Sequence, residues 1–250
     1  MIFRYDFRRT NLSNIVIPDL VLPQDQNVRL SGVSASFSRD SRDNSLDAHK
    51  GIYESFELDM NPSSFGSNTN FGRFLGQTAY YKSLTSDSSL VWANSLRLGM
   101  EHAFGGAHIP ISESFFSGGG STLRGFSLNG AGPQRQVSVC PTDNPNCGEK
   151  ISVPVGGKQL VILNSELRFP LGISLPFVGG NLGGAAFYDG GNVYTNVSFK
   201  QVFSDFTHTV GFGFRYKTPV GPVRIDIGHL MNAPPGVKTY QFFLTLGQAF

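Results

Sequence analysis

Several short motifs offer the residue types of an enzyme, and each lacks a residue that the chemistry requires. Residues 120–125 carry the outer glycines of a phosphate-binding loop, but Phe126 stands where the lysine must be. Residues 211–213 read Gly-Phe-Gly without the third glycine of a dinucleotide site, and no Gly-x-Ser-x-Gly elbow occurs. Metal-ligand spacing is also missing among the five histidines, which are His49, His102, His108, His208 and His229. The sequence therefore predicts no enzyme, no metal site and no cofactor.

An arginine in a glycine-rich segment could instead hold that segment in place by pairing with a carboxylate. Residues 115–126 read Phe-Phe-Ser-Gly-Gly-Gly-Ser-Thr-Leu-Arg-Gly-Phe. Glycines let such a segment pack closely against other backbone, and the guanidinium of Arg124 offers five donors that suit a bidentate bond to a carboxylate. Asp189 lies in the later run Phe-Tyr-Asp-Gly-Gly, and Glu166 and Asp226 are further carboxylates on alternating segments. An arginine exposed on a solvated loop is the alternative interpretation of Arg124.

Hydrophobic residues alternate with small or polar ones along most of the chain. In residues 90–101, for example, Leu90, Trp92 and Leu98 share one side, and Arg97 and Glu101 share the other. This period of two is typical of strands. We expect roughly ten strands, each near the 9–11 residues that cross a bilayer at a tilt. They cover residues 2–12, 27–40, 51–60, 70–83, 89–104, 158–171, 183–194, 207–218, 222–231 and 240–250.

The composition and the connectors favour a membrane barrel over a soluble domain. Charged residues make up 15% of the chain, whereas about a quarter is usual in soluble domains. Connectors alternate between short ones, such as 85–88 and 218–222, and long ones at 105–157, 195–206 and 232–239, with 172–182 as an exception. Outer-membrane barrels have short turns on one side and long loops on the other. No apolar run approaches the roughly 18 residues of a transmembrane helix, and the scattered charges, net +2, indicate no nucleic-acid partner.

The last predicted strand ends in an aromatic residue with apolar residues at alternate positions before it. The residues of this pattern are Phe242, Leu244, Leu246 and Phe250. A long exposed apolar edge would be an aggregation hazard in a soluble protein. The pattern resembles the C-terminal targeting signal of outer-membrane barrels. An edge strand of a soluble sheet, in a β-sandwich whose apolar faces meet in one core, is the alternative.

Two cysteines, Cys140 and Cys147, flank a polar run with two prolines and two asparagines. Such a run is compatible with a small disulfide ring in an oxidising compartment. Two incidental thiols are the other interpretation.

The glycine-rich segment and the later aspartate motif resemble those of the BamA/TamA family of outer-membrane assembly factors. In that family the connector 105–157 corresponds to loop six, which folds back into the barrel lumen, and its arginine pairs with the aspartate of a Phe-x-Asp-x-Gly motif. The loop-six residues here are Gly118, Gly119, Gly120, Arg124, Gly125 and Phe126, and the strand motif is Phe187, Asp189 and Gly191. The resemblance covers nearly the whole chain, including residues 38–51 and 211–226, and implies an all-β, antiparallel transmembrane β-barrel in the bacterial outer membrane.

The resemblance also implies a function: inserting or exporting other proteins without ATP, through the seam between the first and last strands. A client strand would pair there with exposed backbone groups. The implied partners are outer-membrane lipids, unfolded client proteins and accessory periplasmic or lipoprotein subunits. A two-partner-secretion exporter of one client and a passive pore are alternatives.

The family resemblance implies a barrel larger than the ten strands expected here, with about sixteen strands. We therefore expect residues 1–250 to be the C-terminal part of a barrel domain, without its first strands or its periplasmic domains. An unusually short member of the family is the alternative, because an even number of strands such as ten could close in principle. The first residues also lack the apolar core of a signal peptide.

Overall fold

The protein is built almost entirely from antiparallel strands. The computed structural model describes residues 1–250 apart from 16, 18–19, 139–147, 149, 174–181, 197–198, 220 and 234–235, and without the side chains of 138 and 199–201. One sheet contains β1 (Ile2–Asn11), β2 (Asn27–Asp40), β3 (Gly51–Asn61), β4 (Phe71–Ser83), β5 (Val91–Ala103), β8 (Gln159–Pro170), β9 (Leu182–Tyr194), β10 (Thr207–Tyr216), β11 (Val223–Leu230) and β12 (Tyr240–Leu246). The predicted all-β antiparallel fold is confirmed.

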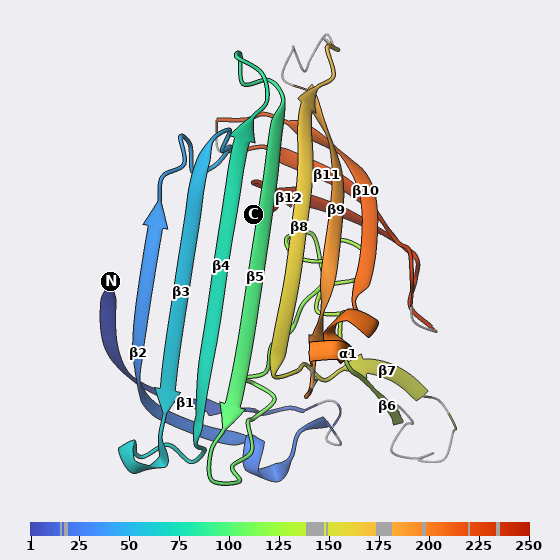
Figure 1. Cartoon of the computed structure of the whole chain (residues 1–250). Coiled ribbons are helices and arrows are strands. Elements are labelled where there is room, and N and C mark those ends of the chain that lie inside the picture. The colour runs from blue at the N-terminus through green and yellow to red at the C-terminus, as the bar shows by residue number, and fades with distance from the viewer. Residues whose placement is uncertain are drawn as a thin grey trace.

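The ten strands are ordered in space as they are in the chain. Each pairs with its sequence neighbours, and β5 pairs with β8 because β6 and β7 lie within the connector between them. The sheet curls strongly, so that β10 forms its right edge and β11 and β12 pass behind β8 and β9 in the view of Figure 1. Among the described residues, β1 and β12 are the two edges of this sheet and do not pair with each other.

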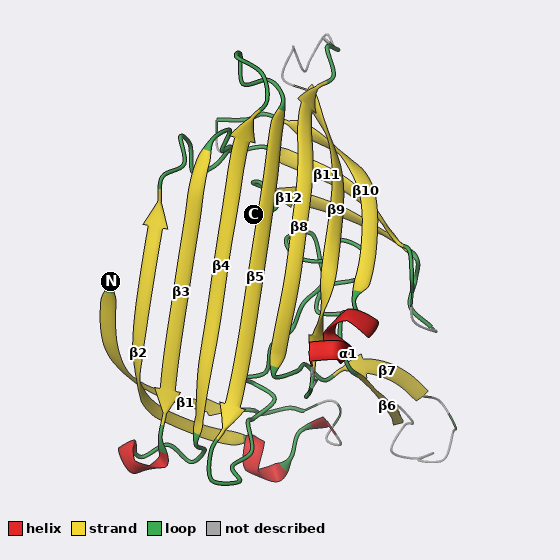
Figure 2. Ribbon diagram, in the orientation of Figure 1, coloured by secondary structure: helices red, strands yellow, loops and turns green. Residues whose placement is uncertain are grey.

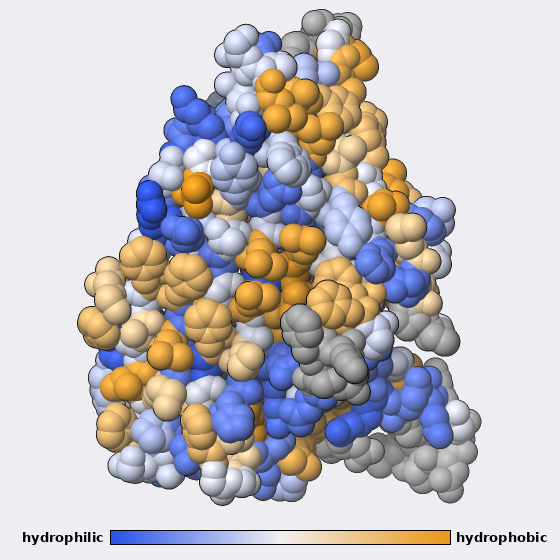
Figure 3. All heavy atoms as spheres, in the orientation of Figure 1, coloured by the Kyte–Doolittle hydropathy of each residue, from blue (hydrophilic) through white to orange (hydrophobic). Residues whose placement is uncertain are grey.

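Side chains alternate between a convex apolar face and a concave face that is small or polar. On β5, Trp92 and Met100 are exposed on the convex face, whereas Ala93 and Glu101 are buried on the concave face. Apolar side chains gather over β3 to β5 and β8, and hydrophilic ones gather toward the end where β6 and β7 project (Figure 3). An apolar belt on the outside is what a strand wall facing lipid requires. A β-sandwich would instead bury the apolar faces in one core.

Connectors of different length lie at opposite ends of the sheet. The turns that join β4 to β5 and β10 to β11 lie at one end, and the connectors from β5 to β8, β9 to β10 and β11 to β12 lie at the other (Figure 2). The connector between β8 and β9 is the exception that the sequence indicated, because it joins the ends of these strands on the short-turn side. Two elements in the long connectors were not expected: the hairpin of β6 (Gln134–Ser138) with β7 (Lys150–Pro154), and helix α1 (Phe199–Ser204). Short 3-10 turns occupy Pro23–Asp25 and Ser63–Phe65. No helix in the part of the chain that the structure describes has the length and apolar character that membrane crossing demands.

The prediction that the last strand continues to residue 250 is wrong. β12 ends at Leu246, and Gly247 turns the chain with a positive φ of 86°. The ring of Phe250 then lies 6.3 Å from the ring of Tyr81, centroid to centroid, on the concave side. Its neighbours are Tyr81 and the small side chains of a buried cluster that contains Ala48, Ala79 and Ala93. Phe250 is therefore not part of the outer apolar belt, although the side chains of Phe242, Leu244 and Leu246 remain exposed on β12.

Candidate functional site

The connector between β5 and β8 enters the concave side of the sheet, and we call its residues 104–158 the lumen loop. Its buried apolar residues, Phe115, Leu123, Phe126 and Ala131, pack against inward-facing residues of β8, β9 and β11. Figure 1 shows the loop running inside the curve of the sheet before β6 and β7 leave it. Isolated bridges join Phe115 to Gly157 and Ser117 to Ala131, and they hold the two ends of the buried segment together.

Two close approaches require glycine. Gly118 has a φ of 115°, and an added Cβ there would collide with the backbone of the loop itself at Ser127 and Gly130. Gly228, on β11, has no room for a Cβ because the carbonyl of Arg124 occupies that space. The loop backbone therefore lies directly on β11, at the point where the arginine is presented.

The other glycines of the segment also lie in the loop's packed region. Gly119 donates its N–H to the carbonyls of Leu123 and Phe126 at 3.3 and 3.1 Å, which closes the turn before the arginine. Gly125 packs beside Thr209 and Leu230.

Arg124 is fully buried and makes a bidentate pair with Asp189 on β9. Its Nε donates to Oδ2 of Asp189 at 2.7 Å, and its Nη2 donates to Oδ1 at 2.8 Å. The backbone N–H of Arg124 also donates to Oδ2 at 3.1 Å. The remaining nitrogen, Nη1, donates to Oε2 of Glu166 on β8 at 2.5 Å. The structure thus brings together the arginine and two of the carboxylates that the sequence singled out.

The strand motif supports this pair from the side. The guanidinium carbon of Arg124 lies 3.4 Å from the ring centroid of Phe187, so the cation rests on the aromatic face. Asn164 donates from Nδ2 to Oδ1 of Asp189 at 2.8 Å and to the carbonyl of Thr122 at 2.6 Å. Gly191 has a positive φ of 141° where β9 passes β8.

Three further arginines extend this pair into a buried network, and they were not among the predicted site residues. Arg168 donates to Glu166, Arg215 to Glu166 and Asp226, and Arg224 to Asp226. Asp226 lies 3.7 Å from Nη1 of Arg124, so its main partners are the other arginines. We call this set the arginine network: Arg124, Arg168, Arg215, Arg224, Glu166, Asp189 and Asp226. Strand alternation placed the six members that lie on strands inward, but their contacts depend on how the strand registers combine with the path of the loop that carries Arg124.

Electrostatics keep Arg124 charged. Burial by itself would lower the pKa of Arg124, but the negative charges of Asp189 and Glu166 outweigh it and raise the pKa above its ordinary value. An arginine buried this deeply would be costly without its partners. The loop is consequently tied to β8 and β9 by a charged contact as well as by apolar packing.

The loop also touches β12, the edge strand. The carbonyl of Gly120 accepts a hydrogen bond from Nη2 of Arg224 at 2.9 Å. A Cβ added to Gly120 would lie 3.0 Å from Cγ2 of Thr245 and 3.4 Å from Cβ of Phe243. The same loop segment therefore contacts β8, β9, β11 and the inner side of the edge strand.

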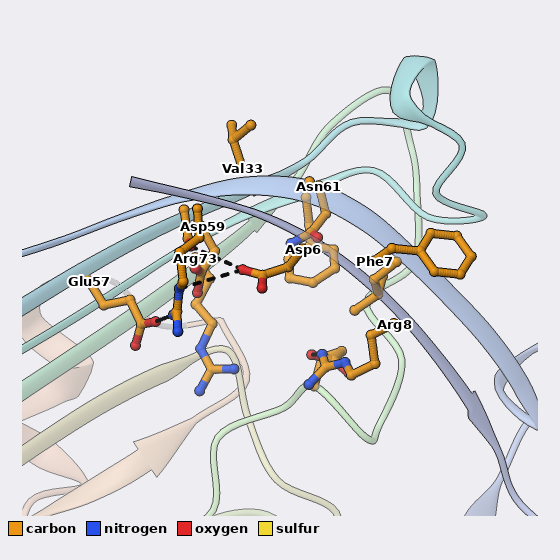
Figure 4. A pocket seen from close by; sticks show the side chains of 14 residues that line it. Asp6, Phe7, Arg8, Val33, Glu57, Asp59, Asn61 and Arg73 are labelled. Carbon is orange, nitrogen blue, oxygen red and sulfur yellow. Dashed lines mark hydrogen bonds and ion pairs between the residues drawn. The ribbon is translucent and has the colours of Figure 1, made fainter. Parts of the chain in front are cut away.

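A second hollow on the concave side lies between β1 and β4, and Figure 4 shows it from close by. Asp6 and Arg8 point into it, whereas Val33 points to the opposite side of the sheet. Its charges pair with each other: Arg4 with Glu57 at 3.3 Å, and Arg8 with Glu113 at 2.5 Å. Within the described residues no group of histidine, cysteine, aspartate or glutamate side chains could hold a metal ion. Cys140 and Cys147 lie outside the described residues.

Comparisons with known proteins agree with this geometry. The model of the Omp85 superfamily domain matches residues 4–250. The chain belongs to the Omp85 superfamily. This confirms the resemblance seen in the sequence, and it makes the sheet part of an outer-membrane β-barrel from a non-enzymatic family of assembly and transport barrels.

Individual relatives are distant. A SAM50-like protein of Schizosaccharomyces pombe is 27% identical over 232 residues, which are 87% of this chain and 43% of that protein. The crystal structure of BamA from Haemophilus ducreyi lacking POTRA domains 1–3 superposes with a TM-score of 0.68 at 18% identity, covering 91% of this chain and 46% of that chain. CdiB from Escherichia coli superposes with a TM-score of 0.57 at 16% identity, covering 90% and 37%. The chain thus spans less than half the length of these relatives.

Proposed function

We propose that this chain forms the C-terminal, seam-bearing part of an outer-membrane assembly factor that inserts client proteins without ATP. The observation that carries the proposal is the lumen loop held by Arg124 against Asp189 and Glu166. A passive pore gains nothing from a loop that fills its lumen. An assembly barrel must keep the shape of its edge strand while the strand paired with that edge is exchanged for a client strand, so it needs an internal support.

The working surface would be the edge of β12. One side of this strand pairs with β11, and its other side has no ladder among the described strands. Unpaired N–H and C=O groups along such an edge are a template for an added strand. Backbone pairing gives affinity without reading the client's side chains, which suits an insertion factor that handles many clients.

The lumen loop would brace this edge from inside. Gly120 lies against the inner side of β12, while Arg124, four residues on, is anchored to β8 and β9. Movement of β12 toward the lumen would therefore press on a segment that is fixed to strands three and four places away in the sheet. The chain would supply this half of the seam, and the strands that complete the barrel, the periplasmic domains and the accessory subunits would belong to the rest of the protein and its partners.

Photocrosslinking at the seam tests this proposal. A photoreactive amino acid would replace Gln241 or Phe243 on β12, or Gln77 on β4 as a matched position far from the seam, in the full-length protein in outer-membrane vesicles. Crosslinks to an unfolded client barrel from β12, and not from β4, are the expected result. Equal crosslinking from both strands would contradict a seam on β12.

A dedicated exporter is the second candidate, because the fold of CdiB also superposes on this chain. An exporter would pass one client through the lumen, so the lumen loop would leave the barrel and crosslinks would come from β4 and β5 inward positions. We propose a bacterial outer membrane as the location. Co-fractionation of the protein with mitochondrial outer membranes would overturn this part.

A further inference from the structure

The arginine network carries more positive than negative charge. Four guanidinium groups face three carboxylates, and all seven side chains are buried. Asp189 is taken up by the bidentate pair with Arg124. The other two carboxylates, Glu166 and Asp226, pair with the remaining three arginines, and Glu166 also accepts from Nη1 of Arg124. One excess positive charge is left in a place where an uncompensated ion is costly.

The excess is accompanied by donors without acceptors. Nη2 of Arg168 and Nε of Arg215 are both buried and have no hydrogen-bond partner. Each side chain is more than nine-tenths buried, at 6% and 4% exposed. Buried polar groups are normally satisfied, so an orphaned guanidinium N–H calls for an acceptor.

Both arginines line one cavity at the end of the barrel where β8 and β10 finish. Its volume is about 490 Å³, and its other basic side chains are Lys217 and His49. The two acids on its wall are already engaged. Asp47 accepts a hydrogen bond from Gln248 at 2.7 Å and pairs with Lys217 at 3.2 Å, and Asp87 is bound by Ser89. Arg168 and Arg215 therefore line the cavity with guanidinium groups whose hydrogen-bonding capacity is only partly used, while the acids on the wall are engaged.

We propose that this cavity binds a phosphate group, either free or on a lipid headgroup, through Arg168 and Arg215 with Lys217 at the rim. Guanidinium groups match the oxygens of phosphate with paired N–H donors. The donors come from β8, from β10 and from the connector after β10, so a tetrahedral oxyanion with several acceptor oxygens suits them better than a planar group. The volume exceeds that of one ion, since ligand cavities span roughly 300–1,000 Å³, and so leaves room for the remainder of a headgroup.

Calorimetric titration of the full-length protein in maltoside micelles tests the proposal. Inorganic phosphate and a short-chain phosphatidic acid would be added separately at constant chloride and ionic strength. The variants are Arg168→Gln, and Arg97→Gln as a control that faces the lumen from β5, bonds to Gln77 and does not line the cavity. We expect saturable binding that weakens about tenfold or more in Arg168→Gln, because that variant loses a charge-assisted contact. Binding should stay unchanged in Arg97→Gln.

Binding of phosphatidic acid alone would assign the phosphate to a lipid. If Arg168→Gln fails to fold, Lys217→Gln serves instead, because Lys217 is exposed and its loss should weaken binding about two- to fivefold. The proposal fails if neither ligand gives saturable binding, or if binding weakens as much in Arg97→Gln as in Arg168→Gln. It also fails if the micelles alone give the whole signal.

Discussion

Removing Asp189 should loosen the lumen loop more than removing Arg124, although the two residues form one pair. With Arg124→Ala the network keeps three arginines and three carboxylates, so its charges balance. Asp189 also keeps the hydrogen bonds from Asn164 and from the backbone N–H of residue 124. With Asp189→Ala, by contrast, four arginines face two carboxylates, and Arg124 keeps one hydrogen bond, to Glu166.

The magnitudes follow from this difference. Breaking a buried charge pair by removing one partner costs about 3–5 kcal/mol. We place Arg124→Ala near the lower end, at about 3 kcal/mol, and Asp189→Ala near the upper end, at about 5 kcal/mol. Because both changes remove the same pair, the double variant should cost about 5 kcal/mol, which leaves a coupling of about 3 kcal/mol.

Hydrogen exchange of the full-length protein in nanodiscs measures these values, with the amides of residues 117–127 as the probe. Arg97→Ala is the control, because it removes a lumen-facing arginine that does not contact the loop's arginine. The reasoning is refuted if Arg124→Ala opens the loop more than Asp189→Ala does. It is also refuted if the two single effects simply add in the double variant.

Three further outcomes follow from the structure. Gly228→Val places side-chain atoms where a loop carbonyl lies, so it should destabilise loop docking by about 1–3 kcal/mol and expose the loop to trypsin. Leu244→Arg puts a charge on the exposed face of β12 and should destabilise the folded protein in a bilayer by about 2–4 kcal/mol if the site lies near the midplane, as measured by urea titration. In the connector after β2, burial raises the pKa of Asp43, but hydrogen bonds from the backbone N–H groups of His49 and Lys50 lower it more, to below the ordinary 3.8. A depressed pKa stabilises the folded connector above pH 3.8 and loses that effect as the pH falls through the lower folded value, so nuclear magnetic resonance should show the connector opening there, and Asp43→Asn should abolish the pH dependence.

The sequence allowed the sheet to be predicted because period-two alternation depends on neighbouring residues alone. The segment predicted at 89–104 is β5, Val91–Ala103, and its inward and outward residues are those observed. The same alternation put Arg168, Arg215 and Arg224 on the inner face. It could not say that one carboxylate, Glu166, accepts from three of the arginines, because that contact requires the registers of β8, β9 and β10 together with the path of the loop.

Other features were missed for local reasons. Residues 134–138 and 150–154 alternate too briefly to be recognised as the strands of a hairpin. The last strand was extended to Phe250 because this terminal aromatic falls in step with Phe242, Leu244 and Leu246 beyond the polar Gln248. Nothing in the pattern shows that Gly247 takes a positive φ and turns the chain inward. The resemblance to a family singled out Arg124 and Asp189, while the contact of Gly120 with Thr245 was visible only in the folded chain.

The most direct test of the assembly proposal is client insertion by the full-length protein carrying Arg124→Ala, Asp189→Ala or both. Purified protein in liposomes would receive an unfolded client barrel, and insertion would be scored by protease protection and by the heat-modifiable mobility of the folded client. The account predicts that each single change impairs insertion and that the double change is no worse than Asp189→Ala alone. Unimpaired insertion in all three variants, with the loop shown to be released by hydrogen exchange, would contradict it.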